Sequence, residues 1–200
     1  MRKIIVVTFV TLDGIMQAPG GPQEDTEGSF RYGGWVVPHF DERLGAVMHE
    51  QMTTPRALLL GRRTYNIFAS YWPTHESDWP GINSATKYVV SRTRPDPLWS
   101  NTVVIKENVA EEIRGLKQQD GPDLHVYGSS GLLQMLFTHD LVDQLWLKIF
   151  PLTLGTGKRL FGDGTRPAGF RLTHTEPTPG GVIVASYERA GDVKTGSFLA

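Results

Sequence analysis

The chain has 200 residues, a formal net charge of −1 and no cysteine, and 40% of its residues are hydrophobic. This length and apolar content fit one folded domain with a substantial core. The even charge balance, without any basic run, argues against nucleic-acid binding, and the lack of cysteine excludes disulfides, thiolate catalysis and cysteine-ligated metal centres.

The apolar run from Ile4 to Val10 leads directly into Asp13-Gly14. It is short and lacks a small-residue cleavage site, so we expect a first core strand and not a signal peptide. No stretch approaches the ~20 apolar residues of a membrane span. We therefore expect a cytoplasmic protein with no membrane partner.

Eight strands and four helices are predicted, in alternating order over most of the chain. The strand-like runs are 3–11, 56–60, 86–91, 102–105, 123–127, 142–150, 170–175 and 181–188. The helix-like stretches are 40–52, 62–69, 109–118 and 131–138. Strand then helix, repeated, predicts a mostly parallel sheet with crossover helices. The last two strands follow one another across Pro177-Thr178-Pro179-Gly180-Gly181, which predicts a hairpin and an antiparallel edge.

We expect one α/β domain over residues 1–190 and a polar, mobile tail over 191–200. Before helix 109–118, Asn108 is the candidate N-cap and Glu111 occupies the capping-box position. At helix 131–138, Ser129 or Ser130 can cap. The buried face of that helix is expected to consist of Leu132, Leu133, Leu136 and Phe137.

The connection over 16–37 is unusually long and rich in glycine, and it carries Phe30, Tyr32 and Trp35 near its end. Structureless connections of this length in a compact domain are functional lids or disordered segments. Aromatic residues at the far end favour a lid that packs over a ligand; a merely flexible loop is the alternative.

Two turns carry the clearest functional signal, because each follows an apolar strand and opens a helix. They are Gly61-Arg62-Arg63-Thr64 and Gly128-Ser129-Ser130-Gly131-Leu132. Such turns point backbone N–H groups at open space, where the helix dipole favours an anion, and arginine adds donors suited to phosphate. Alone, each fits ordinary turn chemistry, and neither matches G-x-G-x-x-G. Together, on either side of a strand ending at Ser91-Arg92, they predict a dinucleotide site.

Taken in order, these residues resemble the dihydrofolate reductase superfamily, in the branch similar to the C-terminal reductase domain of riboflavin-biosynthesis enzymes. Besides the two turns, the matching segments are Thr11-Leu12-Asp13-Gly14, Tyr88-Val89-Val90-Ser91-Arg92, Leu141-Val142-Asp143-Gln144-Leu145 and Pro151-Leu152-Thr153-Leu154-Gly155-Thr156-Gly157-Lys158-Arg159-Leu160-Phe161. The last of these, P-x-x-L-G-x-G followed by Leu-Phe, is rather specific, whereas the individual turns are not. The resemblance covers residues 4 to 188.

The resemblance implies NADPH as the hydride donor, and it assigns positions for the cofactor. Arg62, Arg63 and Thr64 would meet the adenosine phosphates, and Ser91 and Arg92 would lie near the ribose 2′-phosphate. The pyrophosphate would be cradled by Gly128, Ser129, Ser130, Gly131 and Leu132, and Gly61 also belongs to the cofactor-binding set. With arginines and no acid in these turns, we expect NADPH to be preferred over NADH.

The chain departs from classical folate reductases at the buried acid of the first helix, whose position falls near Gly45. Asp41, Glu42 and His49 are close in sequence but point elsewhere on a helix. We therefore expect a reductase of a small heterocycle, resembling 5-amino-6-(5-phosphoribosylamino)uracil reductase more than folate reductase. Because these 200 residues include no cysteine, we expect the reductase half alone, without the cysteine-containing zinc deaminase of bifunctional enzymes. The alternative is a non-catalytic nucleotide-binding module of the same fold.

Five residues are candidates for the substrate side of the site. Asp13, at the carboxyl end of the first strand, is the catalytic candidate, for holding substrate or relaying a proton; an Asp-Gly turn is the alternative. Lys148 sits mid-strand among apolar residues and either contacts a substrate phosphate or carboxylate or snorkels from an edge. Gln17, Trp35 and Phe40 complete the predicted substrate-binding set, with core packing as the rival for the two aromatics.

The six histidines show no H-x-x-x-H or H-E-x-x-H spacing, so no metal site is expected. Family resemblance implies a homodimer, and the apolar segment 145–154 gives weak support to it. The expected partner is thus a small-molecule substrate together with a second copy of the chain.

Overall fold

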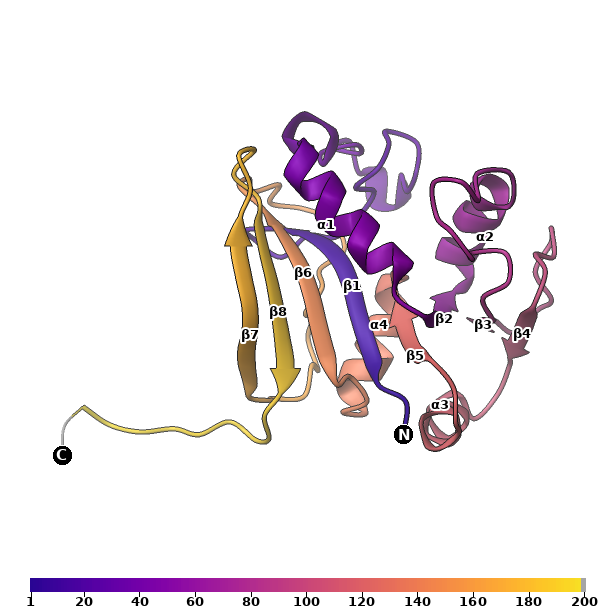
Figure 1. Cartoon of the computed structure of the whole chain (residues 1–200). Helices are drawn as coiled ribbons and strands as arrows, with labels where there is room; N and C mark the ends of the chain where they lie inside the picture. Colours follow the sequence, from indigo (N-terminus) through magenta and orange to yellow (C-terminus); the bar gives the residue numbers. More distant parts are fainter. Residues whose placement is uncertain (199–200) are drawn as a thin grey trace.

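An eight-stranded sheet runs through the computed structural model, which describes residues 1–198 (Figure 1). The strands are β1 (Ile4–Thr11), β2 (Arg56–Gly61), β3 (Lys87–Val90), β4 (Thr102–Ile105), β5 (Asp123–Val126), β6 (Gln144–Phe150), β7 (Phe170–Pro177) and β8 (Ile183–Arg189). The helices are α1 (Glu42–Thr53), α2 (Arg62–Tyr71), α3 (Val109–Gln118) and α4 (Ser130–Thr138), with short 3₁₀ turns η1 (Glu27–Ser29), η2 (Val37–His39) and η3 (Trp72–Thr74).

The strand order is β4-β3-β2-β5-β1-β6-β8-β7, and the pairs from β4 to β6 are all parallel. Strand β8 pairs antiparallel with both β6 and β7. The hairpin between β7 and β8 closes through a bond from Thr178 N to Val182 O and turns at Gly181, whose φ is 81°. The predicted parallel sheet with an antiparallel C-terminal hairpin is confirmed.

The core lies on both faces of the sheet because the central strands are buried on both sides. Along β2, Ala57 and Leu59 pack with α3 and α4, whereas Leu58 and Leu60 pack with α2. A continuous apolar run is what a parallel strand buried on both faces requires. Helix α1 covers the same face as α2, farther along the sheet, through Leu44 and Val47 against Phe150 of β6.

Helix capping departs from the sequence prediction at two helices. Helix α3 has the predicted bounds, but Asn108 adopts a left-handed conformation with φ of 47° and its side chain makes no cap bond. Ser129 occupies the N-cap of α4, again with no side-chain cap bond. The predicted buried face of α4, formed by Leu132, Leu133, Leu136 and Phe137, is confirmed.

Beyond β8, residues 191–198 extend away from the sheet without helix or strand (Figure 1). The last two residues of the predicted tail, 199–200, lie outside the described residues. Across residues 1–198, every helix is too short or too polar to cross a membrane.

Candidate functional site

The two predicted phosphate turns lie against one another. Their strands β2 and β5 pair in parallel, so both turns are at the carboxyl edge of the sheet, where ligands bind in open α/β folds. Gly61 N donates to Gly128 O at 3.2 Å. A Cβ on Gly61 would lie 3.0 Å from Ser129 N, and one on Gly128 would lie 2.8 Å from Thr64 Oγ1. Only glycine permits this approach, so the two turns form one site.

The helices that follow these turns begin without side-chain caps. Neither Gly61 before α2 nor Ser129 before α4 contributes a capping bond, and no acidic residue occupies either first turn. Helix α1 differs, because Asp41 accepts from Leu44 N at 2.8 Å and caps it. Two uncapped N-termini on adjacent strands present backbone donors and positive dipole ends to an anion. These residues fit the phosphates of a dinucleotide.

The arginines of the first turn have different roles. Arg62 reaches the segment after β3, where its guanidinium donates to Ser91 Oγ at 3.1 Å and to the carbonyl oxygens of Thr93 and Arg94, each at 3.1 Å. The structure thus brings Arg62 and Ser91 together, and Arg92 is exposed beside them. Arg62 holds in place the segment that carries Arg92.

A cavity of about 340 Å³ extends from these turns into the protein, between α1, α2 and the sheet. Its apolar lining includes Met48, Met52, Ile67, Phe68, Trp72, Trp79 and Tyr127. Its polar lining includes Thr8, Gln17, Glu24, Asp25, Gln51, Arg63, Thr64, Ser129, Ser130, Lys148 and Lys158. A mostly apolar cavity with a few polar groups beside a phosphate site is the usual form of a small-molecule site.

Lys148 faces this cavity from β6 and is only 2% exposed. Its Nζ donates to Gln51 Oε1 on α1. Burial lowers the pKa of Lys148 to about 7. Because β6 lies between β1 and β8, Lys148 is not on an edge strand and does not snorkel.

The mouth of the cavity is lined by charged groups that bind each other. Lys158 Nζ donates to Asp25 Oδ2 and Glu27 Oε2, each at 2.6 Å, and Arg63 also contacts both acids. Although burial acts to raise the pKa of Asp25, Lys158 and Arg63 hold it below its usual value. Gln17 donates to Asp25 O and Glu27 O, so its side chain lines the cavity while it fastens the 16–37 loop.

Three predicted substrate-side residues lie away from the cavity. Asp13 accepts hydrogen bonds from Gly155 N at 2.7 Å, from Leu154 N and from Thr11 Oγ1. Although desolvation acts to raise the pKa of the Asp13 carboxyl, these bonds hold it below its usual range. Asp13 therefore anchors the segment after β6, and its expected proton-relay role has no geometric support.

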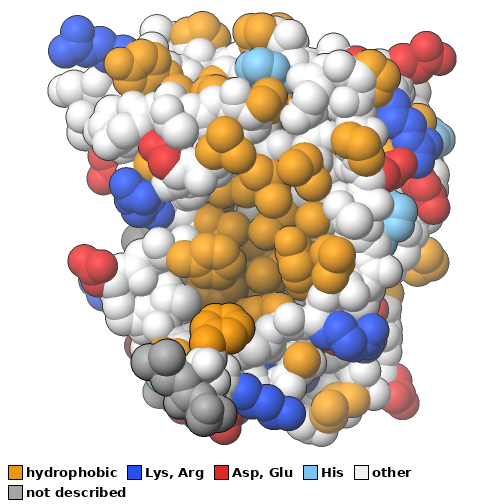
Figure 2. All heavy atoms as spheres, turned by 90° about the vertical axis from the view of Figure 1, so that its left-hand side faces the viewer, with side chains coloured by type: hydrophobic (Ala, Val, Ile, Leu, Met, Phe, Trp, Pro, Cys, Tyr) orange, Lys and Arg blue, Asp and Glu red, His pale blue; other side chains and the backbone are white. Residues whose placement is uncertain are grey.

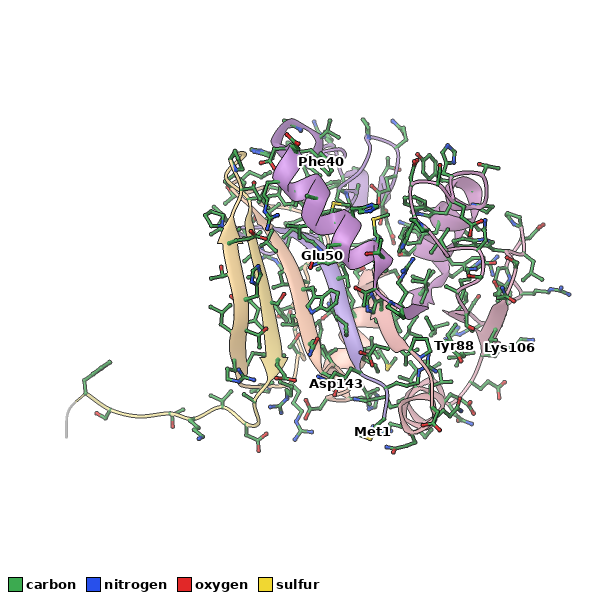
Figure 3. The ribbon with its side chains drawn as sticks, viewed as in Figure 1. Met1, Phe40, Glu50, Tyr88, Lys106 and Asp143 are labelled. Carbon is green, nitrogen blue, oxygen red and sulfur yellow. The ribbon has the colours of Figure 1, made fainter. Side chains whose placement is uncertain are left out.

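The aromatic candidates are likewise elsewhere. Trp35 is buried, with its Nε1 donating to Gln17 O at 2.8 Å and its ring 5.2 Å from that of Phe150. Phe40 lies at the start of α1, half exposed, whereas α1 lines the cavity near its other end (Figure 3). Core packing, the rival interpretation, accounts for Trp35. The 16–37 loop packs through Phe30 and Trp35 and lines part of the cavity; its lid role stays a prediction.

Several cavity residues were not predicted, notably Trp72, Trp79, Met48, Gln51 and Lys158. Met48, Gln51 and Met52 share one helical face at spacings of three and four, a pattern that could have singled them out. In contrast, nothing local marks Trp72 and Trp79 as cavity walls. Among residues 1–198, no three His, Asp or Glu side chains are grouped so as to hold a metal ion.

Solved structures show that the fold is dihydrofolate reductase-like. A protein of Shewanella sp. PV-4, named for riboflavin biosynthesis, has a TM-score of 0.65 at 21% identity, covering 95% of this chain and 99% of that one. Dihydrofolate reductase from Enterococcus faecalis, complexed with NADP(H) and RAB-propyl, gives 0.57 at 14% identity, with 94% and 96% covered. A pyrimidine reductase-like protein of Corynebacterium diphtheriae gives 0.61 at 13% identity, with 96% and 93% covered.

The sequence itself matches the RibD C-terminal domain family over residues 2–184, and the chain belongs to that family. The uncharacterized protein YyaP of Bacillus subtilis (strain 168) is 28% identical over 196 residues, covering 95% of this chain and 96% of YyaP. The uncharacterized YwjB of the same strain is 23% identical over 189 residues, covering 94% and 99%. The predicted superfamily and branch are confirmed, and the fold is of the reductase type.

Proposed function

We propose that this chain is an NADPH-dependent reductase that transfers a hydride to a small heterocyclic substrate. The observation that carries the proposal is the pair of interlocked turns, Gly61 against Gly128, opening two uncapped helices directly beside a cavity of about 340 Å³. When bound, NADPH supplies the hydride, and the protein supplies binding, orientation and exclusion of water. The family and the dihydrofolate reductase-like neighbours support the same activity class.

Different residues would hold different parts of the cofactor. The N-termini of α2 and α4, with Thr64 and the turn from Gly128 to Leu132, suit the pyrophosphate and neighbouring phosphates. Ser91 and the exposed Arg92, on the segment that Arg62 fastens, suit the ribose 2′-phosphate. Arg63 would contact a phosphate once its ion pairs with the acidic residues at the cavity mouth have broken.

The substrate would occupy the cavity, and its walls argue against folate. On α1 the cavity is lined by Met48, Gln51 and Met52, and none of Asp41, Glu42 and His49 lines it. A protonated pterin needs a buried carboxylate on this helix, so reduction resembling that of an aminouracil derivative fits better than folate reduction.

Incubation with NADPH and a panel of pterins, pyrimidines and quinones tests the proposal. Loss of NADPH absorbance with a pyrimidine or quinone is the expected result. Cofactor binding without turnover of any compound would favour the non-catalytic nucleotide-binding module, and no cofactor binding would remove the dinucleotide site.

We also propose a cytoplasmic homodimer. Apolar side chains gather in one area on the side of β7 and β8, with charged side chains around its rim (Figure 2). On these strands Leu172 and Ile183 are 48% and 44% exposed. A contiguous exposed apolar area rimmed by polar residues is typical of a protein–protein interface. Sedimentation should show a dimer at micromolar concentration and a monomer for the double variant Leu172→Lys, Ile183→Lys. A wild-type monomer would contradict the proposal.

A further inference from the structure

The chain leaves the sheet after β8 as an extended segment, residues 191–198, which we call the arm. Its base is fixed, because Ala190 N donates to Gly169 O and Gly169 N donates to Gly191 O, each at 2.8 Å. Beyond this base the arm runs away from the sheet instead of folding back onto it (Figure 1). The fold thus holds the arm at its start and gives it a direction.

The side chains of the arm fit an apolar protein surface. Val193 is half exposed and Phe198 is fully exposed, and moving such side chains out of water is strongly favourable. The charged residues of the arm are one acid, Asp192, and one base, Lys194. Because these charges balance, the arm has no net attraction to nucleic acid or to a charged membrane surface. An uncharged, apolar surface of a protein is therefore the partner that its chemistry fits.

An apolar area lies on the side toward which the arm points. Leu172 of β7 is in register with Tyr187 of β8, and the alternation of side chains along a strand puts Phe170 and Ile183 on that same face. Figure 2 views the molecule from the side toward which the arm extends in Figure 1, and it shows apolar side chains gathered there. A second copy seated on this area would lie within reach of the arm.

The apolar area alone is small for a stable interface. Two neighbouring strands, ~4.8 Å apart and roughly 25 Å long, present a face of about 250 Å². A stable protein–protein interface takes about 800 Å² from each partner. Fully extended, residues 191–198 span about 26 Å, which is long enough to lie across a molecule seated on this face. The arm therefore supplies contact area that the two strands lack.

We infer that the arm crosses to a second copy of this chain and packs Val193 and Phe198 against it, while the apolar areas of the two copies meet. In a two-fold dimer each contact is made twice, so each copy both gives and receives an arm. The inference rests on the proposed homodimer, and it is independent of the proposed reductase activity.

Cross-linking measures directly where the arm lies, because the sequence has no cysteine and an introduced thiol is therefore unique. Thr195→Cys is labelled with a benzophenone maleimide, and normal and isotope-labelled preparations are mixed and left to exchange subunits. After irradiation, mass spectrometry should find peptides that join heavy to light copies. Cross-links only within one copy, or none from the arm, would overturn the inference.

Sedimentation measures what the arm contributes to association. Phe198→Ala should raise the dissociation constant of the dimer at least tenfold, and a chain that ends after Asp192 should raise it further. Leu98→Ala is the matched control, because Leu98 is also apolar and 47% exposed but precedes β4, at the other edge of the sheet. This control should leave the dissociation constant unchanged, and Leu98→Cys should give no cross-link between copies.

These measurements separate the arm from the dimer. A wild-type dimer that Phe198→Ala and the shortened chain leave unchanged would overturn the arm alone. A wild-type monomer would overturn the arm and the proposed homodimer together. The arm contributes no residue to the apolar core clusters, so both variants should unfold at the wild-type temperature when measured as monomers. Weaker association in a protein of unchanged stability cannot be attributed to misfolding.

Discussion

The mouth and the floor of the cavity differ in how their polar groups are satisfied. At the mouth, Arg63 and Lys158 are both bound to Asp25 and Glu27, and Gln17 fastens the same loop. The protein completes this network with its own residues. A phosphate arriving there has to displace an existing ion pair, so its net gain is modest and depends on salt.

At the floor of the cavity, which Trp79, Tyr127 and Lys148 form, the protein leaves polar groups short of hydrogen-bond partners. Lys148 has one acceptor, and the indole N–H of Trp79 and the hydroxyl of Tyr127 have none. The contrast teaches that the exposed mouth satisfies its polar groups with its own residues, whereas the buried wall of the cavity keeps polar groups without hydrogen-bond partners. Changes beneath the floor should therefore act on pH dependence, and changes at the turns should act on packing and cofactor binding.

The largest expected effect comes from His125, which lies in β5 beneath the floor. Both of its ring nitrogens are buried without partners, and burial, with Arg56 and Lys148 nearby, lowers its pKa to about 4. Its ring otherwise contacts Trp146 and Tyr127, and none of these neighbours is acidic. The imidazole thus stays neutral in the folded protein down to about pH 4.

In the unfolded chain the same imidazole takes up a proton near pH 6.5, so acid favours unfolding between these two values. The contribution of His125 to the free energy of unfolding is fully present above pH 6.5, and the free energy falls by up to about 3 kcal/mol toward pH 4. His125→Phe should flatten this part of the curve in urea titrations at stepped pH. An unchanged acid slope would show that His125 is solvated or paired in solution.

A smaller effect is expected at the phosphate turns from Gly61→Ala. The added Cβ would lie 3.0 Å from the backbone nitrogen of Ser129, so the two turns must separate. We expect a loss of about 2 kcal/mol of unfolding free energy, typical of overpacking, and weaker NADPH binding. Chemical denaturation and cofactor titration on the same sample measure both; wild-type behaviour in both would show that the turns are not in contact.

The smallest effect, opposite in sign, is expected from Gly115→Ala in α3. Nothing lies within 4 Å of the added Cβ, and alanine favours the helix by about 1 kcal/mol over glycine. This variant is the control for Gly61→Ala, because it makes the same chemical change away from the site. Chemical denaturation should show a higher free energy of unfolding, and the affinity for NADPH should be unaltered. A lower affinity for NADPH would indicate coupling between α3 and the site.

Much of the fold could be predicted because its signals are local. Periodicity and breakers fixed 102–105 as a strand and 109–118 as a helix, with the bounds that the structure has. The Gly61 and Gly128 turns were predicted to serve one dinucleotide site, but their direct contact depends on the pairing of β2 with β5, which sequence order alone does not reveal. Asn108 occupies the predicted N-cap position of α3, but the predicted side-chain cap was wrong, because sequence does not reveal a left-handed backbone at a polar residue.

The cavity was predicted less well, since it is assembled from distant segments. Lys148 was found because a charge inside an apolar strand is itself a signal. From the sequence, Trp35 and Phe40 were equally suited to stacking on a ligand. The direction in which the 16–37 loop packs decides which aromatic residues reach the cavity, and it buries Trp35 in the core. The aromatic walls of the cavity are Trp72 and Trp79 instead.

The most direct test of the account is a titration of the wild type with NADPH and NADH, followed by tryptophan fluorescence, since Trp72 and Trp79 line the cavity. NADPH should bind at least tenfold more tightly, as charge-assisted contacts to a 2′-phosphate predict. The double variant Arg62→Ala, Arg92→Ala should lose that preference while keeping its affinity for NADH. A wild type that binds neither cofactor, or a double variant that loses both equally, would contradict the account.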